Sequence, residues 1–225
     1  MEFRLLDIAR PFCVSKKQKE KRMYITAREI TPLPGRLQDT IASGTQLVQE
    51  MNQKFGSAMA ASTEIGGNPN KLWVTGFWPA LSDYQSFIES YMTDPELTGK
   101  MNMFSSFISE AQDQIGQVIR QPGERKAFAQ MHRGRIKSTH FQEGLELIMK
   151  LADHISELSG TEAGLIAPVT GDQYEIIFVN YADSLQELRG MVENWSTDET
   201  YQDMFVQGSE YFESSFDVTY SRFIG

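Results

Sequence analysis

The feature that most constrains this chain is an internal repeat. The pattern of residues 23–120 returns in residues 128–225 at a shift of about 104 positions, after a polar linker at residues 121–127. The matches join apolar residues of two predicted helices and the glycine after each: Leu37 with Phe141, Ile41 with Leu145, Leu47 with Leu151, Met51 with Ile155, and Gly56 with Gly160. The chain should therefore fold into two similar units, preceded by a basic arm at residues 1–22.

The repeat is expected to change length in its second copy. Aligning the aromatic residues of the third strand makes the second hairpin about three residues shorter, which pairs Trp73 with Tyr174 and Phe77 with Phe178. A compensating insertion at residues 194–196 would then restore the first shift. Both changes fall where loops or helix breaks tolerate them.

Each unit has the element order βαββαβ. We expect these elements in the first unit: a strand at 24–31, a helix at 36–55, strands at 58–64 and 71–78, a helix from about 84 to 110 with a break at 93–96, and a strand at 115–120. This order predicts an α+β fold of two ferredoxin-like units, each a four-stranded antiparallel sheet with helices on one face.

The second face of each sheet would carry apolar and aromatic side chains. Left in water, it would form a larger patch than a monomer usually shows. Packing the two sheets face to face removes the patch, and the linker lets one chain supply both halves. We therefore expect a pseudo-dimeric α/β barrel, which could enclose a small ligand.

Composition agrees with a globular protein that needs no covalent support. The chain has 225 residues, of which 40% are hydrophobic, and its single cysteine, Cys13, rules out an internal disulfide. A net charge of -9 opposes nucleic acid binding, because that affinity comes largely from basic residues at phosphates. No apolar stretch approaches the roughly 20 residues of a membrane span. We expect a soluble, cytoplasmic protein and leave homo-oligomer formation open.

The chain resembles the dimeric α/β-barrel superfamily over almost all of residues 23–225. Residues 27–37 look like the first strand and helix start of NIPSNAP-type members, and the break at 93–96 looks like one common across the superfamily. The second half departs from this pattern at Ser138-Thr139-His140, which replaces the Pro-Gly turn. The resemblance implies a role among cofactor-free quinol monooxygenases of the antibiotic-biosynthesis type, haem-binding or haem-degrading proteins, small-molecule isomerases and members of unknown role.

Arg28 and His132 are the candidate catalytic residues, because they occupy the same repeat position on the first strand of each unit. His132 could be a general base, or an axial ligand if haem binds, since histidine titrates near neutral pH. Arg28 could stabilise an anion. The structural alternatives are a hydrogen-bonded sheet histidine and a surface or salt-bridged arginine next to Glu29.

Four aromatic residues are the candidate substrate-binding residues: Trp73, Phe77, Tyr174 and Phe178. They could form walls for an aromatic ligand, although aromatic residues at alternate strand positions also build cores. Trp195 is expected to be a packing anchor.

The remaining polar candidates have structural interpretations. Arg133 and Arg135 would share the strand face opposite to His132, where they could form an anion site or salt bridges to helices. His140 is expected next to a capping box of Thr139 and Gln142. His154 is expected to be solvated on the polar side of its helix.

Missing motifs exclude several enzyme classes. The sequence has no Gly-x-Gly-x-x-Gly, phosphate-binding loop, nucleophile elbow or His-Glu-x-x-His, and three widely spaced histidines do not suggest a metal site. We therefore predict a barrel that binds a small hydrophobic or aromatic molecule without a cofactor. It could be a cofactor-independent monooxygenase acting on an aromatic or quinol-like substrate. The alternatives are a haem-binding or haem-degrading barrel and a non-enzymatic assembly protein with a filled barrel.

Overall fold

The computed structural model describes residues 23–213 and 216–224, so the predicted basic arm lies outside the described residues. The first half has these elements: β1 (Met23–Pro32), α1 (Leu37–Phe55), β2 (Ala60–Glu64), β3 (Leu72–Trp78), α2 (Leu81–Met92), α3 (Pro95–Ser105) and β4 (Ile108–Arg120). The second half has these: β5 (Phe128–Arg135), the 3-10 turn η1 (Ser138–His140), α4 (Phe141–Ser159), β6 (Gly164–Pro168), β7 (Glu175–Ala182), α5 (Leu185–Ser196), α6 (Glu199–Tyr211) and β8 (Asp217–Ile224).

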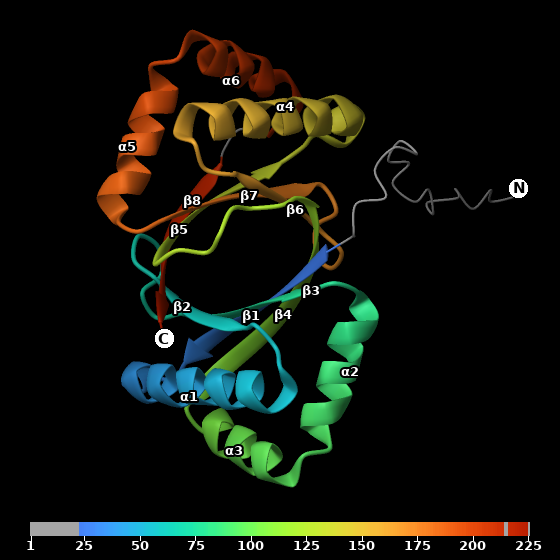
Figure 1. Ribbon diagram of the computed structural model, residues 1–225, viewed down its shortest axis with the longest axis vertical. Coiled ribbons are helices and arrows are strands. Elements are labelled where there is room, and N and C mark those ends of the chain that lie inside the picture. Colours follow the sequence, from blue (N-terminus) through green and yellow to red (C-terminus); the bar gives the residue numbers. More distant parts are fainter. Residues whose placement is uncertain (1–22, 214–215, 225) are drawn as a thin grey trace, which may run out of the picture.

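The strands of the described residues form one closed barrel in the order β1-β3-β2-β8-β5-β7-β6-β4. Each half contributes four neighbouring strands, and the halves join at two antiparallel seams, β2 with β8 and β4 with β6. Figure 1 shows the two sheets facing each other, with α1, α2 and α3 outside one sheet and α4, α5 and α6 outside the other. The predicted α+β class and the face-to-face packing of two ferredoxin-like halves are confirmed.

The repeat keeps a constant shift through the helices and the hairpins. Each α-helix of the second half begins 104 positions after its counterpart in the first half. In the hairpins, Ser62 pairs with Trp73, and Ile166 pairs with Ile177 at the same shift. The predicted shortening of the second hairpin is therefore wrong, because Trp73 corresponds to Ile177. The predicted insertion at 194–196 is also wrong, since these residues are part of α5.

Local sequence sets the helix ends. α1 and α4 end at Gly56 and Gly160, whose φ angles of 65° and 66° lie in the left-handed region that favours glycine. α3 and α6 begin after Asp94 and Asp198, whose carboxylates accept hydrogen bonds from the backbone amides three residues later, at 3.0 and 2.8 Å. These side-chain caps explain the predicted break in the second helix of each half, which is confirmed.

The last strand of the first half is longer than predicted. α3 ends at Ser105 instead of near residue 110, and β4 starts at Ile108 instead of at residue 115. β1 pairs with β4 along the whole length of β1, from Met23 opposite Val118 to Pro32 opposite Ile108. The long partner strand therefore extends β4 through polar residues that have no strand pattern of their own.

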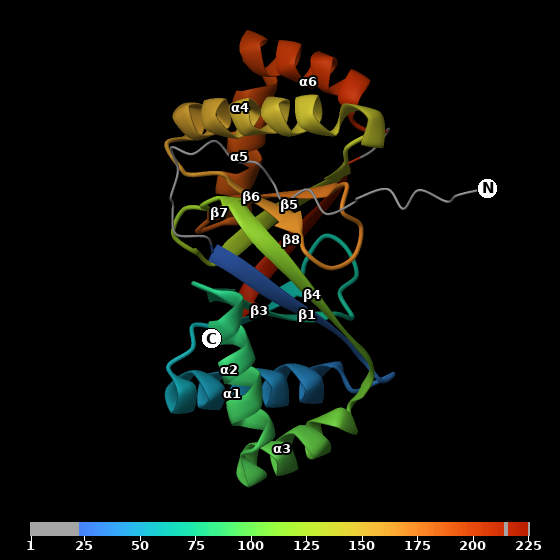
Figure 2. The same cartoon turned by 90° about the vertical axis from the view of Figure 1, so that its right-hand side faces the viewer.

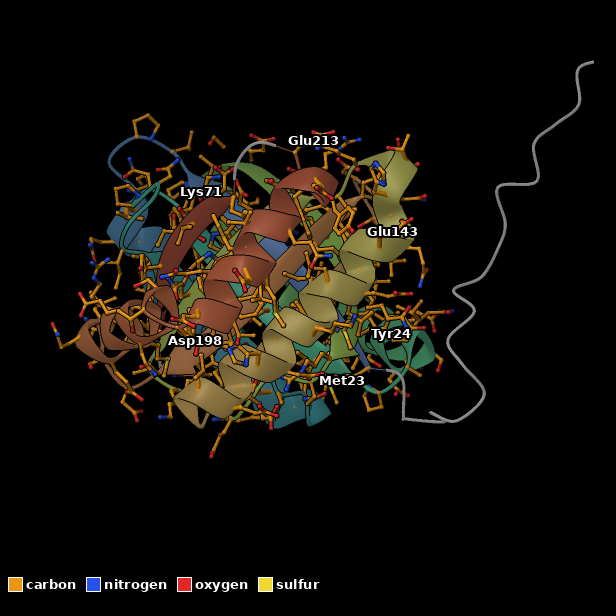
Figure 3. All side chains as sticks on the ribbon, turned by 90° about the horizontal axis from the view of Figure 1, so that it is seen from above. Met23, Tyr24, Lys71, Glu143, Asp198 and Glu213 are labelled. Carbon is orange, nitrogen blue, oxygen red and sulfur yellow. The ribbon has the colours of Figure 1, made fainter. Side chains whose placement is uncertain are left out.

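Strand side chains alternate between the inside of the barrel, here called the lumen, and the layer between each sheet and its helices. One apolar cluster lies in the lumen: Val118, Ala129, Ile166, Val179 and Tyr181. Two larger clusters fill the sheet-helix layers of the two halves. Figure 2 shows the helices covering both outer faces, and Figure 3 shows α4 and α6 side by side over the second sheet. No described helix is long and apolar enough to cross a membrane.

Candidate functional site

Arg28 and His132 both point away from the lumen, each into the sheet-helix layer of its own half. In the ladder, Arg28 lies opposite Val74 and His132 lies opposite Phe178, and both partners belong to the helix-facing side. Each of the two residues lines a separate cavity. The predicted pair of base and cation is therefore not brought together in one site.

The Arg28 cavity has a volume of about 90 Å³. At its mouth, the Arg28 guanidinium makes two hydrogen bonds to the Asp113 carboxylate, Nε to Oδ1 at 2.6 Å and Nη2 to Oδ2 at 2.7 Å. These bonds raise the pKa of Arg28, although burial opposes them. The predicted salt-bridge alternative for Arg28 is thus confirmed, but its partner is Asp113 on β4 and not Glu29, which pairs with Lys71 at 2.6 Å.

The walls of the Arg28 cavity combine tyrosines with flexible apolar side chains. Tyr84 and Tyr91 line it from α2, and burial raises the pKa of Tyr84, so this phenol stays protonated and can donate a hydrogen bond. The apolar wall includes three methionines: Met51, Met59 and Met101. An uncharged aromatic molecule could lie among these side chains with an oxygen directed at Arg28.

The His132 cavity is smaller, at about 60 Å³. His132 contacts Phe178 edge to face, with ring centroids 5.8 Å apart, and its Nε2 has no hydrogen-bond partner among the described residues. Burial lowers the pKa of His132 to about 4. A neutral imidazole with so low a pKa is a weak base for a phenol, whose pKa lies near 10. Trp195 from α5 also lines this cavity, and its Nε1 likewise lacks a partner within the described chain.

Haem does not fit beside His132 in this structure. A haem group is far larger than this cavity of about 60 Å³, which is walled by Phe178, Trp195, Tyr201 and Phe205. The unpaired Nε2 could ligate a metal, but the aromatic side chains occupy the space where a porphyrin would lie.

The four predicted aromatic wall residues lie in three different places. Trp73 and Phe77 face the lumen, where Trp73 lines a cavity and Phe77 packs in the apolar cluster. Phe178 faces the helices beside His132. Tyr174 precedes β7 and lies against Phe141 at 5.8 Å between ring centroids. These residues therefore do not form one aromatic wall.

The lumen is not filled by side chains. A cavity of about 340 Å³, here called the lumen cavity, lies between the two sheets and is lined by residues of both halves. It argues against the predicted alternative of a filled barrel. Neither Arg28 nor His132 lines it.

The other two histidines differ from expectation. His140 is the last residue of η1 and the N-cap residue of α4. No side-chain hydrogen bond caps this helix, so the predicted capping box is absent. His154 is half-buried, with Nε2 2.7 Å from Asp198 Oδ1, instead of solvated. Within residues 23–213 and 216–224, no group of three or more His, Cys, Asp or Glu side chains could hold a metal ion.

The sequence prediction missed Asp113, Tyr84, Tyr91 and Trp195 as cavity residues. Tyr91 and Trp195 are counterparts at the constant shift of 104, and each lines the cavity of its half. The shared aromatic character at one repeat position was therefore a usable signal. The wrong insertion at 194–196 hid it.

No protein-family profile and no curated protein sequence matches the chain. Solved structures do match. A proposed monooxygenase from Lactobacillus acidophilus superposes with a TM-score of 0.67 at 8% identity, over 91% of this chain and 94% of the other. An anthrone oxidase-like protein gives 0.60 at 10% identity, over 92% and 93% of the two chains. A haem-binding protein from Thermus thermophilus gives 0.54 at 9% identity, over 91% and 92%.

Because the sequence identities are only 8%, 10% and 9%, these matches show similarity of fold and not of function. Both halves and the closed barrel are included in each match, because the matched part covers about nine-tenths of both chains. The chain has the dimeric α/β-barrel fold of these proteins, with both ferredoxin-like halves supplied by one polypeptide.

Proposed function

We propose that this protein is a cofactor-independent monooxygenase that oxidises an aromatic or quinol-like molecule in the Arg28 cavity. The observation that carries the proposal is a guanidinium held at the mouth of an apolar cavity that two tyrosines also line. The lumen cavity is larger but is lined mostly by apolar side chains, and the imidazole in the His132 cavity is a weak base.

The chemistry follows from the charge that a substrate would develop. A quinol or anthrone that loses a proton becomes an oxyanion, and a nearby cation favours that charged form. Arg28 would lie beside the oxygen, and Tyr84 would donate a hydrogen bond to it. The proton leaves to water through the half-exposed mouth at Arg28 and Asp113. The electron-rich ring then reduces O2.

The reaction balances without an added reductant. For anthrone, one oxygen atom of O2 converts the ring CH2 group to a carbonyl, and the second oxygen atom leaves as water with two hydrogens of the substrate. The substrate supplies all the electrons. The protein contributes binding, charge stabilisation and partial exclusion of water.

The size of the Arg28 cavity limits the substrate. A dry cavity of about 150 Å³ binds benzene, so the enclosed 90 Å³ can hold only part of a polycyclic molecule. The three methionines of the wall have flexible side chains that can repack around a ligand. The rest of the substrate would lie in the mouth. The names of two structural neighbours, a proposed monooxygenase and an anthrone oxidase-like protein, support the same reaction class.

Oxygen consumption with anthrone tests the proposal. The wild-type protein should consume O2 faster than the uncatalysed reaction, and Arg28→Gln should lower kcat/KM by about a hundredfold, as for loss of one oxyanion partner. Arg28→Lys should retain part of the activity. His132→Gln is the matched control and should retain full activity. If His132→Gln abolishes turnover and Arg28→Gln does not, the site lies in the other half.

A further inference from the structure

The lumen cavity is a second place where a ligand could bind, separate from the proposed oxidation. Its volume of about 340 Å³ is within the range of small-molecule sites. The space exists because small residues occupy central lumen-facing positions of five strands: Ala27, Ser62, Thr75, Ala129 and Ser221. Larger apolar side chains, Ile25, Met131, Ile166 and Ile177, surround this space. The interior is therefore suited to an apolar molecule.

One cation lies on the wall of the lumen cavity. Arg133 of β5 projects across the barrel toward Trp73 of β3, and its guanidinium carbon is 5.7 Å from the centre of the Trp73 ring. Its nearest carboxylate is Glu175, at 3.6 Å from Nη1, which is too long for a hydrogen bond. Within the described chain, the guanidinium of Arg133 has no hydrogen-bond partner, although only about a fifth of the side chain is exposed.

Other acidic side chains, beside Trp73 or in the lumen lining, have partners of their own. Glu29 forms an ion pair with Lys71, with 2.6 Å between Lys71 Nζ and Glu29 Oε1. Glu64 accepts hydrogen bonds from Trp73 Nε1 at 2.9 Å and from the backbone amide of Asn68 at 2.7 Å. Asp172 binds Arg135 at 2.6 Å. These contacts leave Arg133 as the lumen-lining cation whose donors are available to a ligand.

A second polar group in the cavity also lacks a partner. Ser221 of β8 lines the lumen cavity, is 1% exposed, and its hydroxyl has no hydrogen-bond partner in the described part of the chain. An unpaired buried hydroxyl is unfavourable unless something occupies its hydrogen-bonding site. A ligand in the lumen could satisfy it with an oxygen atom.

We propose that the lumen binds a small organic acid with an apolar body. Its carboxylate would pair with the guanidinium of Arg133, since the planar fork of arginine matches both carboxylate oxygens. The apolar body would lie among the isoleucines and Met131, beside the ring of Trp73. Because a cavity of about 150 Å³ binds benzene, a lumen of about 340 Å³ has room for a two-ring body.

Calorimetric titration of the whole chain with 2-naphthoate at pH 7.5 tests this proposal. The neutral analogue 2-naphthamide has the same ring system without the charge and should bind more weakly. Arg133→Gln should weaken 2-naphthoate binding by about tenfold or more, as expected for hydrogen bonds to a charged group, and should change 2-naphthamide binding by less than about twofold. Arg133→Lys should restore part of the preference for the acid.

Neighbouring residues on one strand provide matched controls. Thr75→Phe places a ring in the lumen cavity and should abolish binding of both compounds, whereas Val74→Phe fills the Arg28 cavity and should leave binding unchanged. Arg28→Gln should also bind 2-naphthoate normally. Loss of binding in Arg28→Gln but not in Arg133→Gln would overturn the proposal by placing the acid in the sheet-helix layer. No heat of binding in the folded wild-type protein would overturn it as well.

Discussion

At the scale of single residues, the burial of His132 predicts how stability depends on pH. The folded protein holds the pKa of His132 at about 4, below the usual value near 6.5 in an unfolded chain. The unfolded state therefore binds more protons below pH 6.5, so the stability contributed by neutral His132 is complete above pH 6.5 and is lost as pH falls toward 4. Between pH 7.5 and 5, this loss amounts to up to about 2 kcal/mol.

Replacement of His132 should remove this part of the pH dependence. Urea unfolding at pH 7.5 and 5 should show a smaller fall in unfolding free energy for His132→Phe and for His132→Gln than for the wild type. The two variants differ in packing, so their absolute stabilities can differ, but neither titrates. If both keep the full wild-type pH dependence, His132 is not neutral and buried as the structure has it.

The identity of single site residues was only partly predictable, and Trp73 and Phe178 show why. The constant shift makes Ile177 the counterpart of Trp73, whereas matching aromatic residues slipped the second hairpin by three positions. Because strand side chains alternate with a period of two, an odd slip moves every side chain to the opposite face. The prediction therefore placed the lumen residue Phe77 and the helix-facing residue Phe178 on one wall. Matching aromatic residues was therefore a less reliable basis for aligning the two halves than the constant shift of 104 positions.

At the scale of elements, the two aspartate caps predict equal roles in the two halves. Asp94 and Asp198 begin α3 and α6, and each also binds a basic side chain of the preceding long helix, Lys54 on α1 and His154 on α4. Figure 3 shows Asp198 beside α4. Asp94→Ala and Asp198→Ala should each lower Tm by about 2 to 4 °C, as loss of one N-cap does in a chain of this size.

The double variant tests whether these caps act independently. They lie in different halves, so the two shifts in Tm should add. Asp203→Ala, an exposed aspartate within α6 that caps nothing, is the control and should leave Tm nearly unchanged. A thermal melt followed by circular dichroism measures all four variants. A control shift as large as those of the cap variants would mean that helix charge, and not capping, is responsible.

Element boundaries were predictable where local chemistry sets them. Gly56, Gly160 and the Asp94-Pro95 step act through their own backbone or side chain, and they end or begin helices as predicted. The start of β4 at Ile108 was not predictable in this way, since it depends on pairing with β1, which is distant in sequence. For the same reason, Asp113 was not predictable as a residue of the Arg28 site, because it lies in the part of β4 that was not expected to be a strand.

At the scale of the whole molecule, closure of the barrel followed from the repeat, but the open lumen did not. Two similar units with one apolar sheet face each have few ways to hide those faces, so the arrangement is a property of the pattern. The volume left inside depends instead on the sum of side chains from all the strands. Small residues such as Ala27, Thr75 and Ser221 give no signal individually in the sequence. They leave a cavity only because the fold places them around the same space in the lumen.

Because the halves meet at two strand seams and a shared apolar cluster, they should associate even when the linker is removed. Residues 23–120 carrying an affinity tag, coexpressed with untagged residues 128–225, should purify as a one-to-one complex. Val179→Glu in the second fragment puts a charge at a lumen position that is 3% exposed and should prevent association, because an unpaired buried charge is costly. Val206→Glu, on α6 and 70% exposed, is the same substitution outside the interface and should have no effect. If the untagged fragment is not retained by its wild-type partner, or is retained equally with Val179→Glu, the lumen cluster does not hold the halves together.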